Sequence, residues 1–185
     1  MIWFDKDMSV FKRLKKSRLR SQLLTLHALE FLMIEQMARD WLKSVNLNYD
    51  SLEEHNVWVV LIGALVAMDK AEFYGAIKTK RSRDKVVEVF EGFLKQGIPI
   101  RDLWTIQCDM DEALCEDRMA KFAKALQDKC GFSEFEACVK CIAIYVSACV
   151  TDDGELLDKV SDALYQFYLR AADDYFVGYD DEQSK

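Results

Sequence analysis

A chain of 185 residues, of which 51% are hydrophobic, has the size of one ordinary domain and can bury a core without disulfides or metals. This excludes a disordered or fibrous polypeptide. One proline and seven glycines supply few of the turn positions that hairpins and sandwiches need. We therefore expect an all-α fold in which residues 1–185 form a single bundle of six to eight helices.

The charge is unevenly distributed along the chain. A formal net charge of −7 argues against general nucleic-acid binding, which needs a basic face. Seven cations and two aspartates give the first twenty residues a net charge of +5, which leaves −12 for the remaining residues. The sequence therefore places a basic segment ahead of an acidic body.

Residues 1–16, here called the basic arm, interleave large apolar side chains with cations. This pattern is typical of helices that bind an anionic membrane surface or the groove of a protein partner, and it also suits packing on the chain's own acidic body. We expect the arm to bind a partner through seven residues: Trp3, Phe4, Phe11, Lys12, Arg13, Lys15 and Lys16.

Neither export nor a membrane span is expected. His27 and Glu30 interrupt the apolar stretch 23–34 that follows the arm, and no small-residue cleavage site comes after it. The longest apolar run, 57–68, has twelve residues and is too short to cross a bilayer. The cysteines fall at helical spacings in a chain that needs no disulfides, so we expect free core thiols and a cytoplasmic protein, at most peripheral to a membrane.

The first half of the chain predicts three helices. A long amphipathic helix runs from residue 17 or 21 to about residue 45. Ser51 and Glu54 have the spacing of a capping box for a second helix, which is apolar on all sides over 57–68. After Asp69 and Lys70 an amphipathic pattern resumes through Ile77 and ends in the polar stretch 78–84. A third helix, with its apolar residues between 86 and 94, ends at Gly97 and Pro99.

The second half predicts one short and one longer helix between 102 and 129, with Gly131 as the cap of the longer one. Ser133 and Glu136 form a second capping-box pattern, which opens the almost wholly apolar helix 135–150. A last helix covers about 155–176, and residues 178–185 form an acidic tail. The two apolar helices are expected at the centre of the bundle.

The chain contains a faint internal repeat, in which an apolar helix ends in an aspartate turn before an amphipathic helix. The two ends read "ALVAMDKAE" and "SACVTDDGEL". This arrangement resembles the TerB-like tellurite-resistance family, an all-helical family with two such turns. The resemblance implies a membrane-associated stress-response complex and a divalent cation bound by acidic residues. The positions that it implicates are Asp69, Glu72, Asp152, Asp153 and Glu155.

Two residue pairs suggest chemistry. Cys138 and Cys141 form a C-x-x-C inside an apolar helix, where two core thiols are expected, because a zinc site would need two further ligands at suitable spacing. His27 and Glu30 share the apolar face of the first long helix, where a structural hydrogen bond is the expected role and an acid–base couple the enzymatic alternative.

No familiar catalytic motif occurs in the chain. We therefore expect a non-catalytic helical adaptor or regulator that binds another protein, in a stress-response or membrane-associated complex. The alternatives are a TerB-like domain that binds a divalent cation and an enzyme that uses His27 with Glu30.

Overall fold

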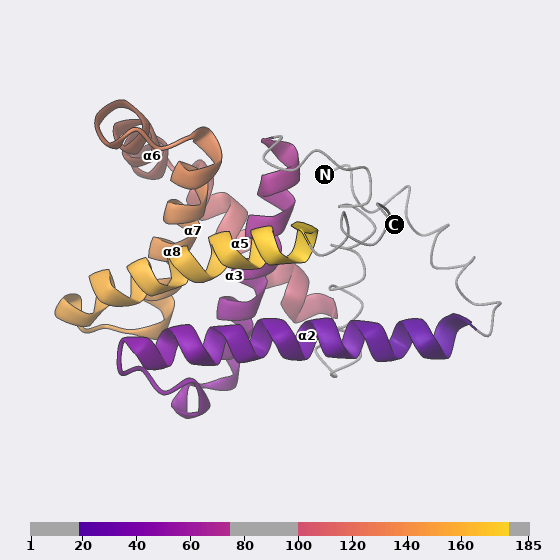
Figure 1. The fold of residues 1–185 in the computed structure, drawn as a ribbon. Helices are drawn as coiled ribbons and strands as arrows, with labels where there is room; N and C mark the ends of the chain where they lie inside the picture. The colour runs from indigo at the N-terminus through magenta and orange to yellow at the C-terminus, as the bar shows by residue number, and fades with distance from the viewer. Residues whose placement is uncertain (1–18, 75–99, 178–185) are drawn as a thin grey trace.

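The computed structural model describes residues 19–74 and 100–177, and within them it contains helices and no strand (Figure 1). The prediction of an all-α bundle is confirmed. The basic arm, the helix expected near 86–94 and the acidic tail lie outside the described residues. In chain order the elements are α2 (Leu19–Ser44), the short 3-10 helix η1 (Tyr49–Ser51), α3 (Glu54–Phe73), α5 (Ile100–Cys115), α6 (Asp117–Cys130), α7 (Glu134–Val150) and α8 (Gly154–Val177).

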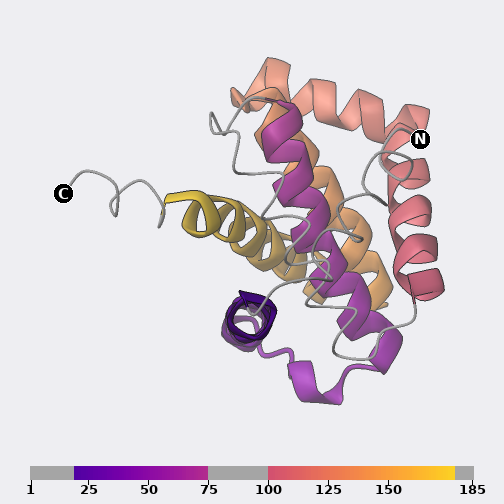
Figure 2. The same cartoon turned by 90° about the vertical axis from the view of Figure 1, so that its right-hand side faces the viewer.

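Helix α3 forms the centre of the bundle and contacts α2, α5, α7 and α8. Figure 2 shows it between α8 on one side and α5 and α7 on the other. Every residue from Val59 to Met68 is buried. A helix that is apolar on all sides needs neighbours on all sides, and the structure confirms that expectation for residues 59–68 of the run 57–68, whereas Val57 and Trp58 are half-buried.

Helix α7 packs antiparallel against α3 and is less enclosed. Its inner face is buried from Ala137 to Ser147, but several residues within that range are only half-buried. Ala148, near the end of the helix, is exposed. The two apolar helices therefore differ, because α7 lies between the core and solvent. Helices α2 and α8 run side by side in opposite directions across α3 and α7 (Figure 1).

Helices α3 and α8 pack closely against each other at one crossing point. The buried Tyr168 hydroxyl of α8 donates a hydrogen bond to the Val60 carbonyl of α3 at 3.0 Å. Gly63 makes room for it, since a Cβ atom at that position would lie 2.3 Å from Tyr168 Oη. The absence of a side chain at Gly63 therefore allows the ring to pack directly on the helix backbone.

Two of the predicted helix ends are confirmed. Ser133 Oγ accepts a hydrogen bond from the Glu136 amide, and the Glu136 carboxylate accepts one from the Ser133 amide, which is a complete capping box at the start of α7. Gly131 has a φ of 73° and ends α6 in the left-handed conformation.

Other local predictions were wrong. Ser51 does not cap α3, because its hydroxyl donates to the Asn48 carbonyl and closes η1 instead. Asp69 is not in a turn: α3 continues to Phe73, with Ala71 buried and Lys70 paired with Asp111 of α5 at 3.4 Å. Continued packing against the bundle therefore extends the helix beyond the aspartate.

The two helices predicted between 102 and 129 exist, but the first is the longer, with 16 residues in α5 and 14 in α6. The apolar stripe expected to bury α6 leaves none of its residues fully buried. Cys130 is exposed at its end, and Phe122 is exposed in its middle. Helix α6 lies at the edge of the bundle against α5 and α7, so its apolar face is only partly covered.

Candidate functional site

Helix α2 buries one face and exposes apolar side chains on another. Ile34, Ala38 and Leu42 recur every four residues and are buried against the bundle. Leu32 and Met33 directly precede Ile34 in the sequence, yet they are 52% and 62% exposed. At about 100° per residue, Leu32 lies about 160° and Met33 about 100° from Ile34 around the helix. Leu32 and Met33 are here called the α2 apolar pair.

The side of α2 on which the pair lies explains its exposure. Ile34 directly follows the pair and is buried, so the bundle still covers α2 at this level. Leu32 and Met33 are exposed because they lie on other sides of the helix than Ile34.

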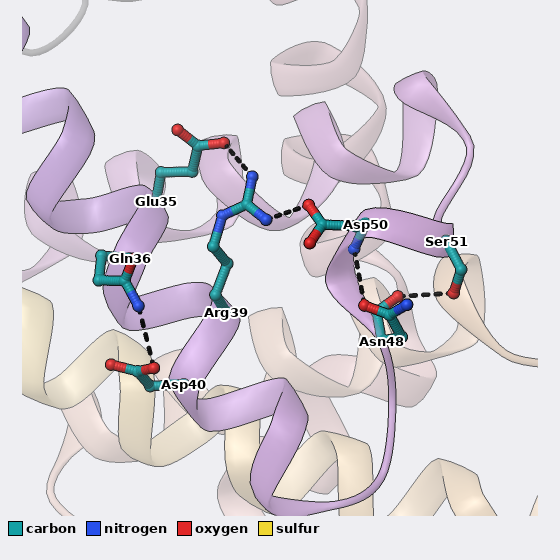
Figure 3. Close-up of polar contacts among 7 residues, drawn as sticks. All are labelled: Glu35, Gln36, Arg39, Asp40, Asn48, Asp50 and Ser51. Carbon is teal, nitrogen blue, oxygen red and sulfur yellow. Dashed lines mark hydrogen bonds and ion pairs between the residues drawn. The ribbon is translucent and has the colours of Figure 1, made fainter.

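Polar residues with paired side chains border the α2 apolar pair. The Arg39 guanidinium lies between two carboxylates, with Nη2 at 2.9 Å from Glu35 Oε1 and Nη1 bonded to Asp50 (Figure 3). Gln36 donates to Asp40 at 3.0 Å one turn apart. These groups satisfy one another within the chain, so a partner can cover the apolar pair without replacing their contacts.

The border carries a small excess of acidic groups. Between Leu32 and Ser44, α2 has Glu35 and Asp40 against Arg39 and Lys43, and Asp50, which pairs with Arg39, adds a third carboxylate. This part of the surface is therefore weakly acidic, like the chain as a whole, whose net charge is −7.

Other large apolar side chains are exposed in less favourable settings. Phe73 is 77% exposed and its ring contacts Tyr74 edge to face at 5.1 Å, but the two directly precede residues 75–99. Trp104 and Phe122 are single exposed side chains on α5 and α6. Isolated exposed apolar residues are common on protein surfaces, so these carry less functional weight than the α2 apolar pair.

The acidic residues implicated in cation binding do not converge. Asp69 is near the carboxyl end of α3, where Lys70 interacts with Cys138, and Asp153 follows the far end of α7. Cys138 and Val150 are twelve positions apart in α7, a rise of about 18 Å. The Glu72 side chain is outside the described part, and within that part no group of three or more histidine, cysteine or acidic residues is placed to hold a metal.

The second aspartate turn has a local structural role. The Asp153 carboxylate accepts hydrogen bonds from the Glu155 amide at 2.9 Å and the Leu156 amide at 3.3 Å, and so caps α8. Asp152 and Glu155 are exposed beside it. Helix capping accounts for the aspartate at this position without a bound cation.

The C-x-x-C thiols are poor nucleophiles. Burial raises the pKa of Cys138, against the Lys70 ammonium and the Tyr74 hydroxyl, which both lower it. Burial and the neighbouring Cys138 raise the pKa of Cys141 to about 11. Both thiols therefore remain protonated at neutral pH.

All six cysteines are free, but the expectation that they fill the core is wrong for Cys108, Cys115 and Cys130, which are exposed. Cys141 is buried, and Cys138 and Cys149 are partly covered. The exposed thiols lie on the outer faces or ends of α5 and α6, the helices at the edge of the bundle. Helical spacing predicted a shared face but not whether that face was inside.

The structure does not describe the side chains of several predicted site residues. The seven residues of the basic arm lie outside the described residues. His27 and Glu30 belong to α2, but their side chains are not among those that the structure describes. Their proposed roles stay predictions.

The chain matches no protein-family model, no curated protein and no solved structure. The TerB-like resemblance therefore also stays a prediction. Among the helices of the described residues, none has the length and apolar character needed to cross a membrane.

Proposed function

We propose that this protein is a non-catalytic helical adaptor that binds other proteins, with α2 as its main binding element. The exposed α2 apolar pair carries this proposal. Apolar side chains next to one another on the outer side of a helix are typical of a surface that a protein partner covers. The polar groups around Arg39 are paired within the chain and would add specificity at the edge of that contact.

The basic arm is the second binding element of the proposed adaptor. It precedes α2 directly, because α2 begins at Leu19. Its cations suit an acidic protein or an anionic membrane surface, and its aromatic side chains supply apolar contact. An adaptor in a stress-response or membrane-associated complex would use the arm for attachment and α2 for protein contact.

The proposal can be tested with the full chain as bait in an extract of its native host, followed by mass spectrometry. The double variant Leu32→Gln with Met33→Gln should lose proteins that the wild type retains. The glutamine amides would have to give up their hydration to enter an apolar contact, which weakens binding. Phe122→Gln is the matched control, since it introduces the same polar side chain in place of an exposed apolar one on α6. Identical captured proteins for all three baits would contradict the proposal.

The role of the arm needs a separate measurement. Deleting residues 1–16 should leave a folded helical body and weaken binding to the captured partner or to anionic vesicles. Raising ionic strength should weaken the same binding, whereas Trp3→Ala with Phe4→Ala should weaken it at any salt concentration. A truncated chain that unfolds, or that binds as well as the full chain, would show that the arm has a structural role instead.

A further inference from the structure

We draw no further inference here: the strongest candidate, the exposed surface patch of Arg118, Lys121 and Lys129 on the outer side of α6, has a small positive charge that Glu116 partly balances, and nothing in the structure shows what covers it.

Discussion

The crossing of α3 and α8 at Gly63 provides a sharp test of how this fold is held together. In Gly63→Ala the new Cβ would lie 2.3 Å from Tyr168 Oη, 2.6 Å from Tyr168 Cζ and 3.1 Å from Val146 Cγ2. Both Tyr168 and Val146 are fully buried, so neither can swing into solvent. Relief of the clash requires α8 to move away from α3 or the Tyr168 ring to move within a packed core.

The expected cost follows from three terms. Overpacking of a buried site costs about 1 to 3 kcal/mol. Displacement of Tyr168 weakens its hydrogen bond to the Val60 carbonyl, worth about 1 kcal/mol. Alanine is a better helix former than glycine by about 1 kcal/mol, which offsets part of this loss. We therefore expect Gly63→Ala to lower the free energy of unfolding by about 1 to 3 kcal/mol.

Urea denaturation followed by circular dichroism measures this change. Gly154→Ala is the matched control, because nothing lies within 4 Å of a Cβ at that position in the first turn of α8. It should leave stability unchanged or slightly raised. Tyr168→Phe removes the nearest clashing atom, so its combination with Gly63→Ala should cost less than the two single changes together. Additive losses, or a Gly63→Ala variant as stable as the wild type, would refute the proposed close contact.

Three other changes test the contacts described above. The buried Tyr49 hydroxyl has no hydrogen-bond partner among the described residues, so Tyr49→Phe should leave urea stability equal or higher, whereas a loss near 1 kcal/mol would reveal a bonded hydroxyl. Ser133→Ala should cost about 1 kcal/mol at neutral pH. Hydrogen bonds from Ser133 lower the pKa of Glu136, so the stabilisation is present above the ordinary carboxyl pKa and is lost as pH falls through the lowered value. The difference in unfolding free energy between wild type and Ser133→Ala should therefore shrink at acidic pH, and a difference that stays constant with pH would refute the coupling. Reductant should leave stability unchanged, and an aromatic disulfide reagent should label the three exposed cysteines in the folded protein but Cys141 only after unfolding, so rapid labelling of Cys141 would contradict its burial.

Sequence patterns predicted the fold well where a local signal agreed with the tertiary environment. A helix that is apolar on every side has no polar face to expose to solvent, so the run 57–68 was expected at the centre of the bundle. Its residues Val59 to Met68 are buried in α3. Ser133 and Gly131 were identified from side-chain chemistry that acts within a few residues, and both form the expected caps. Such signals depend on only a few neighbouring residues and little on the rest of the chain.

Predictions failed where two local structures competed for the same residues. Ser51 and Glu54 have the same spacing as Ser133 and Glu136, but Asn48 precedes Ser51 and offers its carbonyl to close a 3-10 turn. Local hydrogen bonding therefore ended at η1 before α3 began. At Asp69, a burial pattern that extends to Ala71 outweighed the turn-forming tendency of an aspartate.

The candidate binding surface was only partly visible in the sequence. Leu32, Met33 and Ile34 are three consecutive apolar residues in one helix, and the first two are exposed while the third is buried. Helical spacing groups Ile34 with Ala38 and Leu42 on the core side and leaves Leu32 and Met33 on other sides of the helix. Whether a neighbouring helix covers those other sides is a property of the packed bundle rather than of α2. The sequence instead favoured the charged arm, since a cluster of cations is visible without a fold.

The case for a binding role on α2 depends on three features occurring together. A single exposed leucine or methionine costs a folded protein little and is common, so exposure alone would not separate α2 from the surface of α6. Adjacency of the two side chains enlarges the apolar surface, and their place away from the buried side of α2 makes it accessible. The groups around Arg39 are paired within the chain, so a partner can cover the apolar pair without replacing their contacts. Replacing Lys43 with glutamate should test whether the charge of this border matters, because it makes the border more acidic and should change the amount of captured partner more at low salt than at high salt. Equal effects at both salt concentrations would show that the charge of the border has no part in the contact.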